Sequence, residues 1–456
     1  MSTLLRRLAA VAVAGAVVAV PVLRGSSRAG DATSTAVQLP ASEPPAPVEL
    51  VSTDRSPAVA PTPATAPKPS VANTAYSHDY VVTDAGCAAD SSAEGLEAFF
   101  SARVGPVIGH DSPRVIPLGG QRYLWLLQDT FIDYTGRAAT MSAGQYISST
   151  ALVQDGRCFT ALQRGTTAAV QSFDPGTGES FNDFFWPAGG SVNGSTLSLF
   201  WIEIIRDPVP ADPLDGSNVH PVKTWLATYD VQSLHRLNFV PAPNPGVAPI
   251  YGFAVADDGN YSYLFGNSFV ENLSLEGGYK NGPHSATKMW LARVPRGHLE
   301  ATPEYRTSNG WSADPATAVP ISSRFFTENA MRPVVIDGHW YSATKPDAFL
   351  GSTVVIDTAP APWGPWTTVV TMPALPRGNT VGMVTYAPIL MPWLDPSGDL
   401  IVDLSQIDIG WEQHNGGDPA RYRPRLFTVP THTPPSGSFG GLEPARRKGD
   451  AQPIAG

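Results

Sequence analysis

The stretch GHDSPRVIPLGGQRYLWLLQDTF, residues 109–131, has the pattern of a β-hairpin. Its central Gly-Gly pair predicts a tight turn, and the apolar and aromatic residues on either side predict two paired strands. Asp111 stands near the start of the first strand, and Asp129 stands at the end of the second. The hairpin therefore carries a carboxylate near the same end of each of its two strands.

The same hairpin design occurs four more times along the chain. Each unit is long enough for four short strands in about 50 to 80 residues, which is typical of a β-propeller blade. Five such units predict an all-β fold, a five-bladed β-propeller of four-stranded antiparallel blades. An irregular β-sandwich or barrel is the alternative. Aligned on their turns, the five units begin at Asp111, Asp183, Tyr251, Glu328 and Tyr386.

The two ends of the chain differ from the repeats in composition. In residues 1–28 a basic pair precedes an apolar run that is short for a membrane span, which predicts a signal peptide or, if uncleaved, a membrane anchor. Residues 29–75 form a Pro/Ala-rich linker that cannot bury a core, and residues 431–456 form a flexible tail. The propeller catalytic domain is expected at 76–430, with one short helix within 93–104. We expect the protein to be secreted or associated with the cell envelope.

Composition narrows the classes of partner. The net charge is −10 and only 15% of the residues are charged, which argues against nucleic acid. A total of 11 Trp and 14 Tyr suits a neutral, ring-shaped ligand such as a sugar. The chain has no Gly-x-Ser-x-Gly elbow, no phosphate-binding Gly loop and no metal-ligand spacing. We therefore expect a monomer that binds a polysaccharide and uses neither a metal nor another cofactor.

The chain contains two cysteines, Cys87 and Cys158. In an exported protein with only one possible pairing, they predict a disulfide. It would join the start of the folded domain to the outer part of the first blade. Two unpaired buried thiols are the alternative.

Alignment of the units places three carboxylates at the entrance of a central channel. Crowded carboxylates repel one another, which raises the pKa of one and leaves a partner ionised. Cleavage of a glycosidic bond by general acid and general base catalysis requires such a pair. The predicted catalytic residues are Asp111, Asp183 and Glu328.

Six further residues are predicted to bind the substrate. Trp186 offers a ring face to a sugar, and two arginines lie three or four residues past their acids. Asp129 would bind a substrate hydroxyl or support the hydrogen-bond network of the channel, although it is equally suited to capping the loop that follows. A salt bridge inside the channel is an equal alternative for each arginine. The predicted binding set is Asp129, Trp186, Arg114, Tyr251, Arg332 and Tyr386.

The sequence resembles a family of secreted actinobacterial propellers that was first defined as a domain of unknown function. The resemblance rests on GHD at 109–111, LWLLQDTF at 124–131 and WPAGG at 186–190, and it extends over residues 76–430. Some members of the family are endo-D-arabinanases of glycoside hydrolase family 183. Their second strand carries Gly-Asp-Thr-Phe, whereas this chain has Gln128 in place of the glycine. By motif, the resemblance points to Asp111 and Asp129 as functional acids.

The resemblance implies a propeller that cleaves the D-arabinan of arabinogalactan or lipoarabinomannan. Together with the acids, it favours a secreted glycoside hydrolase. One alternative is a non-catalytic propeller that binds glycan or a cell-wall partner, which would need aromatics but no acid pair. Another is a structural envelope protein tethered to the membrane through its N-terminus.

Overall fold

The computed structural model of the chain describes residues 76–173, 180, 182–206, 219–247, 249–267, 288–322, 332–346, 352–379, 382–408 and 416–430. The predicted signal or anchor segment, linker and tail lie outside these residues. So does Glu328. In the described part of the chain, no helix is long and apolar enough to cross a membrane.

The described strands form five separate antiparallel sheets, which are the blades of the propeller. Blade 1 contains β1 (Val81–Cys87), β2 (Val107–Gly119), β3 (Arg122–Ile132), β4 (Gln145–Asp155), β5 (Cys158–Thr166) and β6 (Ala169–Gln171). Blade 2 contains β7 (Asp183–Asn193), β8 (Thr196–Arg206), β9 (Val219–Asp230) and β10 (Arg236–Pro241). Blade 3 contains β11 (Ile250–Asp257), β12 (Tyr261–Asn267), β13 (Met289–Pro295), β14 (Glu304–Thr307) and β15 (Gly310–Ser312).

The remaining strands form the last two blades. Blade 4 contains β16 (Val334–Ile336), β17 (His339–Thr344), β18 (Thr353–Ala359) and β19 (Thr367–Pro373). Blade 5 contains β20 (Met383–Leu394), β21 (Leu400–Asp408) and β22 (Arg425–Val429). The described helices are α1 (Ala93–Phe100) and four short 3₁₀ turns, η1 (Met141–Ala143), η3 (Pro315–Thr317), η4 (Arg377–Asn379) and η6 (Pro419–Arg421).

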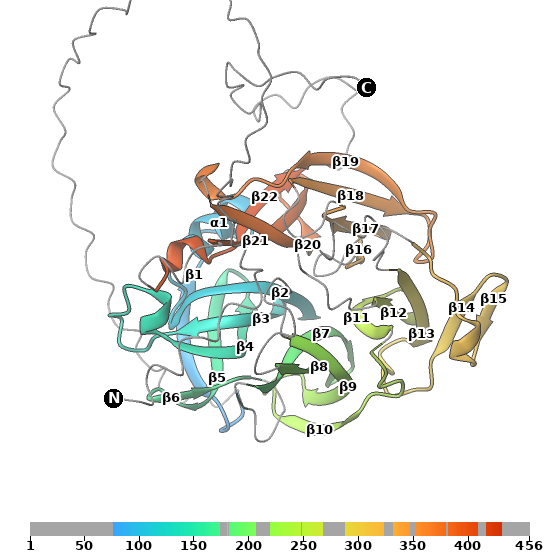
Figure 1. Cartoon of the computed structure of the whole chain (residues 1–456), viewed down its shortest axis with the longest axis horizontal. Coiled ribbons are helices and arrows are strands. Elements are labelled where there is room, and N and C mark those ends of the chain that lie inside the picture. The colour runs from blue at the N-terminus through green and yellow to red at the C-terminus, as the bar shows by residue number, and fades with distance from the viewer. Residues whose placement is uncertain are drawn as a thin grey trace, which may run out of the picture.

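The first strand of each hairpin unit lies nearest the axis. Seen along the short axis of the molecule, β2, β7, β11, β16 and β20 surround the centre, and strands such as β10, β15 and β19 lie at the rim (Figure 1). Each inner strand contacts the next around the ring, including β20 with β2. The five-bladed β-propeller predicted from the repeats is therefore confirmed. The number of strands nevertheless varies, because blade 1 gains β1 and β6 and blade 5 has three described strands.

The nearly continuous apolar run of β3 is explained by its place between two blades. Successive side chains of a strand point to opposite faces of its sheet. Trp125 and Leu127 pack in the core shared with Ile389 of blade 5. Leu124 and Leu126 pack in the core shared with blade 2. Both faces of β3 are covered, and burying one such side chain contributes about 1.5–3 kcal/mol.

Four of the five inner strands contain β-bulges or similar shifts of register. The register of β2 shifts between Asp111 and Arg114, and that of β20 shifts between Tyr386 and Ile389. The register of β7 shifts between Pro187 and Gly190, and that of β11 shifts between Ile250 and Ala254. A bulge bends its strand and changes the direction of the side chains beside it, and bulges are frequent next to active sites.

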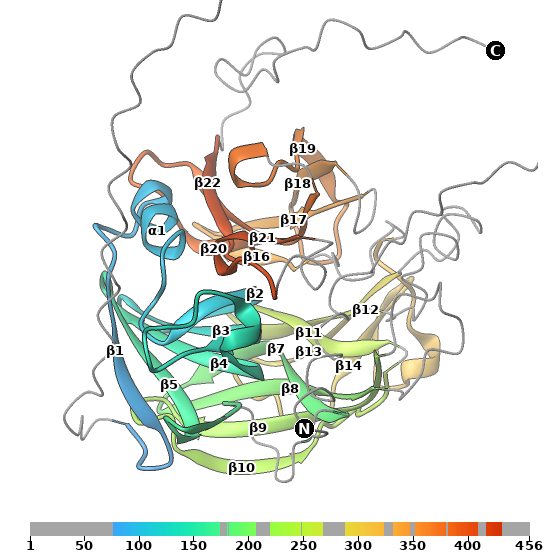
Figure 2. The ribbon, with the colours of Figure 1, turned by 60° about the vertical axis from the view of Figure 1, so that its left-hand side comes forward.

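Helix α1 crosses the junction between the first and last blades (Figure 2). Its N-cap residue Ser92 accepts a hydrogen bond from the Gly95 amide, and the Ala93 amide donates to Asp395 of blade 5. The Glu97 carboxylate accepts from Arg377 at 2.7 Å and from the Leu426 amide at 2.7 Å. The helix thus lies between β1 and β2 of blade 1 in the chain but is anchored on blade 5.

Among the described strands, no β-sheet is shared across this junction, and β1 pairs with β5 at the outer side of blade 1. Hydrogen bonds between individual residues close it instead. The Ser112 amide donates to Ser405 Oγ at 2.8 Å, and the His110 amide donates to the Tyr422 carbonyl at 2.9 Å. The ring is therefore joined between β2 and β20 by polar contacts and packing.

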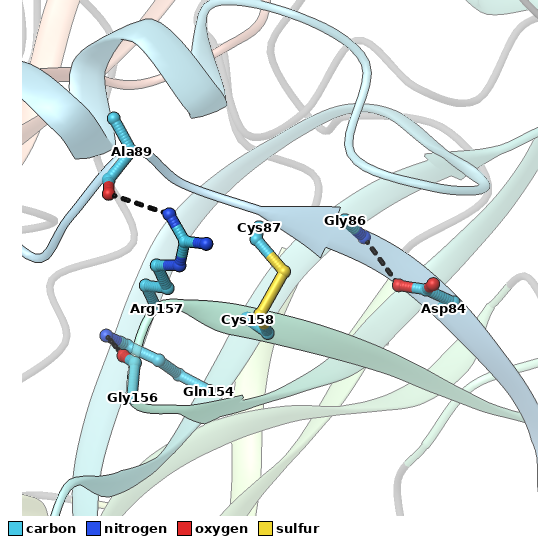
Figure 3. Close-up of a disulfide and its surroundings, with 8 residues drawn as sticks. All are labelled: Asp84, Gly86, Cys87, Ala89, Gln154, Gly156, Arg157 and Cys158. Carbon is cyan, nitrogen blue, oxygen red and sulfur yellow. Dashed lines mark hydrogen bonds between the residues drawn. A yellow bond between two sulfur atoms is a disulfide. The ribbon is translucent and has the colours of Figure 1, made fainter.

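The predicted disulfide is present and joins β1 to β5. Cys87 and Cys158 are register partners in these strands, and their Cα atoms lie 3.9 Å apart (Figure 3). Both cysteines are therefore paired, and the prediction is confirmed. The bridge fixes the N-terminal strand at the outer side of blade 1.

Replacing Cys87 and Cys158 together by serine is expected to lower the free energy of unfolding by about 2–4 kcal/mol, because the bridge spans 71 residues and restricts the unfolded chain. Urea unfolding of the double variant and of the oxidised wild type measures the difference. Equal midpoints and slopes for the two proteins would contradict this expectation.

Candidate active site

Two buried carboxylates occupy neighbouring strands of blade 1. Asp111 of β2 pairs in register with Gln128 of β3, and Asp129 follows directly. The register between β2 and β3 shifts at this position. Asp129 has a φ of 37°, which is a left-handed conformation that Asp tolerates better than most residues. Adjacent strands lie about 4.8 Å apart. The backbone thus brings the two acids close together near the axis.

Side chains from three other strands donate hydrogen bonds to these acids. Tyr386 of β20 donates from its hydroxyl to Asp111 Oδ2 at 2.6 Å. Tyr146 of β4 donates to Asp129 Oδ1 at 2.6 Å, and Trp186 of β7 donates from Nε1 to the same oxygen at 3.1 Å. The acid pair is thus held by residues of blades 1, 2 and 5.

The surroundings of Asp111 favour its protonated form. Its side chain is buried, and this burial together with the nearby Asp129 carboxylate raises its pKa well above the usual 3.8. The Tyr386 hydrogen bond and the Tyr422 hydroxyl act in the opposite direction. Asp129 Oδ1 accepts two hydrogen bonds, one from an OH group and one from an N–H group.

The phenols around the pair remain neutral donors. Burial raises the pKa of Tyr422 well above 10, and the charges of Asp111 and Asp129 add to this effect. Burial and the Asp129 carboxylate raise the pKa of Tyr146 in the same way. The cluster therefore contains one acid that holds its proton, one carboxylate that receives hydrogen bonds, and neutral phenols around both.

This arrangement suits proton transfer to a leaving oxygen. A protonated carboxylic acid is a general acid, and an ionised carboxylate nearby acts as a base or a nucleophile. Glycoside hydrolysis uses these two functions together. No group of three or more His, Cys, Asp or Glu residues in the described ranges is arranged to hold a metal ion.

His110 lies next to Asp111 but is not part of the cluster. Its ring is buried and packs edge-on against Phe100 of α1, with 5.7 Å between the ring centres. Burial lowers its pKa to about 3, so the imidazole is neutral at physiological pH. This placement agrees with the alternation of side chains along a strand.

The structure brings together four of the residues predicted from the sequence: Asp111, Asp129, Trp186 and Tyr386. Asp183 is exposed at the first residue of β7, and none of the hydrogen bonds recorded for the described residues links it to the cluster. Tyr251 packs in the core against Tyr305, with 5.1 Å between the ring centres, and so does not join the acids. Glu328, the third predicted catalytic acid, lies outside the described residues.

The two predicted arginines, Arg114 and Arg332, lie together beside one ring. The Cζ atom of each is 5.3 Å from the centre of the Phe253 ring of β11. Arg114 donates to the carbonyls of Ser112 and Pro113, and it is not among the salt bridges of the described residues. The proposed salt bridge within the channel is therefore not seen for Arg114.

Two residues of the cluster were not predicted from the sequence. Tyr146 is the second residue of β4, and Tyr422 follows the 3₁₀ turn η6. Neither lies in the first strand of a unit, where the alignment sought channel residues. The only sequence signal was the position of Tyr146 two residues into a strand that pairs with β3.

Comparison with known proteins places these features in a family. A family model described as a domain of unknown function, DUF5005, matches residues 95–432. No curated protein matches the chain. Among solved structures, a putative hydrolase from Bacteroides ovatus is similar over 78% of this chain and 92% of its own, with 16% identity and a TM-score of 0.54.

A second solved structure, the GH43_1 enzyme from Xanthomonas citri in complex with xylotriose, is similar over 75% of this chain and 90% of its own. The two share 12% identity with a TM-score of 0.39. At 16% identity, the similarity to the Bacteroides ovatus structure shows a shared fold and nothing further.

Proposed function

The chain belongs to the DUF5005 family, and we propose that it is a glycoside hydrolase in which Asp111 and Asp129 are the catalytic carboxylates. One observation carries this proposal: two buried carboxylates on neighbouring strands, each receiving a short hydrogen bond from a tyrosine. A ring that only supported the fold would gain stability from apolar side chains at these positions. The similar structure from Bacteroides ovatus is described as a putative hydrolase, which agrees with this proposal.

In the proposed reaction the Asp111 carboxyl donates its proton to the glycosidic oxygen as the bond to the anomeric carbon breaks. The Asp129 carboxylate either removes a proton from an attacking water or forms the new bond to the anomeric carbon itself. In both cases water supplies the hydroxyl of the product sugar. Nuclear magnetic resonance of the first product anomer distinguishes inversion from retention.

We propose D-arabinan of arabinogalactan or lipoarabinomannan as the substrate. The support is the sequence motif around Asp111 and Asp129, together with the neutral, aromatic character of the cluster. The Trp186 indole supplies an apolar face beside the acids, and sugars pack their C–H faces on such rings. Asp183, exposed at the start of β7, is a candidate for contacts with the polysaccharide outside the acid pair.

Incubation of the full chain with purified arabinogalactan and lipoarabinomannan tests the proposal. The expected result is release of arabinose-containing oligosaccharides from both polymers, with none from xylan. Binding to the polymers without release would favour the non-catalytic glycan-binding alternative. N-terminal sequencing of protein recovered from the culture medium tests the proposed secretion and cleavage of the signal segment.

Replacing Tyr386 by phenylalanine is expected to shift the alkaline limb of the kcat/KM profile to higher pH. The Tyr386 hydrogen bond lowers the pKa of Asp111, so its removal raises that pKa and keeps the general acid protonated over a wider range. A matched control is Tyr251→Phe, because Tyr251 lies in the core away from the acids. An unchanged pH profile in Tyr386→Phe would mean that Asp111 is not the acid whose titration sets the alkaline limb.

A further inference from the structure

The outer strands of blade 3 carry aromatic and basic side chains on one face. Arg306 of β14 and Trp311 of β15 are register partners, so both point to the same side of this hairpin. Arg293 of β13 lies on that side as well, because its register partner Glu304 stands two residues before Arg306. The hairpin lies at the rim of the propeller, away from the inner strands (Figure 1). The sheet therefore gathers these side chains into one patch far from the axis.

Guanidinium groups and aromatic rings alternate across this patch and continue onto blade 4. The Arg293 Cζ atom lies 4.1 Å from the centre of the Tyr261 ring and 4.2 Å from that of the Trp311 ring. The Arg306 Cζ atom lies 5.8 Å from the centre of the Trp311 ring and 5.1 Å from that of the Trp363 ring. Trp363 belongs to the turn between β18 and β19 of blade 4. We call these five residues the rim cluster.

The blade 4 end of the rim cluster is open to solvent. Trp363 is 38% exposed, and it is the only aromatic side chain among the exposed large apolar residues of the described ranges. Its ring meets that of Trp311 edge to face, with 6.0 Å between the ring centres. These contacts and the Arg306 guanidinium restrict the indole, so a ligand would lose little affinity to side-chain ordering. An exposed and restrained indole is suited to the C–H face of a sugar ring.

Arg306 supplies hydrogen-bond donors beside this indole. Its Nη1 atom donates to the Gly310 carbonyl at 3.1 Å, which is the only hydrogen bond of its side chain to a described residue. Arg306 is in none of the salt bridges of the described ranges, whereas Arg293 pairs with Glu304 at 2.9 Å. A guanidinium group carries five N–H donors, and Arg306 is only half-buried. Donors therefore remain for the hydroxyl oxygens of a sugar.

We propose that the rim cluster is a second binding site for the polysaccharide, where Trp363 stacks on a neutral sugar ring and Arg306 donates to its hydroxyl groups. This inference rests on the proposed function, because the ligand is the polymer that the acid pair cleaves. A polyanion is a poorer match, since Arg306 is the one cation of the cluster without a paired carboxylate and the net charge of the chain is −10. A polymer that reaches both sites binds more tightly than either site alone would hold it. The rim cluster thus keeps the protein on the polysaccharide between cleavage events.

Binding of the full chain to immobilised arabinogalactan tests the site, with Asp111→Asn in the parent and in every variant so that the polymer stays intact. Trp363→Ala is expected to raise the Kd about tenfold, as loss of one ring contact with a sugar would. Trp363→Phe keeps a ring and should raise the Kd less. The control is Leu237→Ala, because Leu237 is 57% exposed on β10 of blade 2 and lies outside the rim cluster. The control should bind like the parent.

Four results would overturn the proposal. They are equal Kd values for Trp363→Ala and the parent, no binding by the parent, a Kd that rises steeply with sodium chloride concentration, and a dimer of the parent that is lost in Trp363→Ala. The third would identify a polyanion as the ligand, because salt screens exposed charges. The fourth, measured by sedimentation equilibrium, would identify a second copy of the chain as the partner. None of these measurements uses hydrolysis, so a wild-type chain that releases no oligosaccharide would disprove the proposed enzyme function without deciding whether Trp363 binds the polymer.

Discussion

Asp111→Asn is expected to lower kcat/KM for arabinan by about 10²- to 10⁴-fold, the usual cost of losing a general acid. The amide has nearly the shape of the carboxyl and can still accept the Tyr386 hydrogen bond, but it has no acidic proton to give. Initial rates of reducing-sugar release measure the effect. Wild-type rates in this variant would exclude Asp111 from the reaction.

The same substitution is expected to leave the fold intact and to increase its stability above neutral pH relative to wild type. The folded pKa of Asp111 is raised above 3.8, so the folded state keeps a proton that the unfolded chain releases. Stability of the wild type therefore falls as pH rises from 3.8 through the folded pKa, and asparagine removes this contribution. Urea unfolding at acidic and alkaline pH measures the difference.

A suitable control for this experiment is Asp257→Asn. Burial also raises the pKa of Asp257, which ends β11 and accepts hydrogen bonds from Ser191 and Ser262. It lies outside the acid pair, so its amide variant should keep its activity. Equal losses of activity in Asp111→Asn and Asp257→Asn would mean that both substitutions lower activity by disturbing the fold.

Asp129→Asn is expected to cause a loss of similar size, about 10²- to 10⁴-fold, because the variant lacks the charge needed by a base or nucleophile. Asparagine tolerates the φ of 37° at this position and can still accept from Tyr146 and Trp186. Comparison of Asp129→Ala with Asp129→Asn separates the effect of backbone strain from that of the lost charge. Both variants lack the charge, but alanine in a left-handed conformation costs about 1–2 kcal/mol. Azide added to Asp129→Asn should restore part of the rate by replacing the lost anion.

The pKa of Asp111 and the effects of the two substitutions on the rate are also expected to be coupled. Removing the Asp129 charge lowers the pKa of Asp111, so any residual activity of Asp129→Asn should have its alkaline limb at lower pH, opposite to Tyr386→Phe. The double variant Asp111→Asn/Asp129→Asn should be scarcely slower than either single variant, because residues that act as a unit are not additive. Losses that multiply in the double variant would argue against a catalytic pair.

Much of the fold was predictable because each blade repeats one local pattern. The Gly-Gly turn at 119 and 120 and the apolar run of β3 are sufficient to indicate the first hairpin. The same run indicates that both faces of β3 are covered, as they are by blades 2 and 5. Asp111 and Asp129 were predictable because they lie at the same end of one hairpin, where the strands themselves fix their separation.

The rest of the site was less predictable because of the bulges. Counting from the turn assumes strict alternation, but the Gly252 region shifts the register of β11. Tyr251 consequently packs in the core, and Phe253, two residues later, lies beside the arginines. Tyr422 could not be found by aligning strands, because it lies in a segment after η6 that only the closed ring brings to Asp111.

The junction between blades 1 and 5 links the closure of the ring to the pKa of Asp111. None of the described strands is shared between neighbouring blades, so at this junction the ring is closed by packing and by contacts between individual side chains. The Tyr386–Asp111 hydrogen bond spans the same junction, and it lowers the pKa of Asp111. Loss of this hydrogen bond alone, with Asp111 still buried, would make Asp111 hold its proton more tightly. One contact between blades 1 and 5 therefore both helps to close the ring and makes Asp111 a stronger acid than its burial alone would allow.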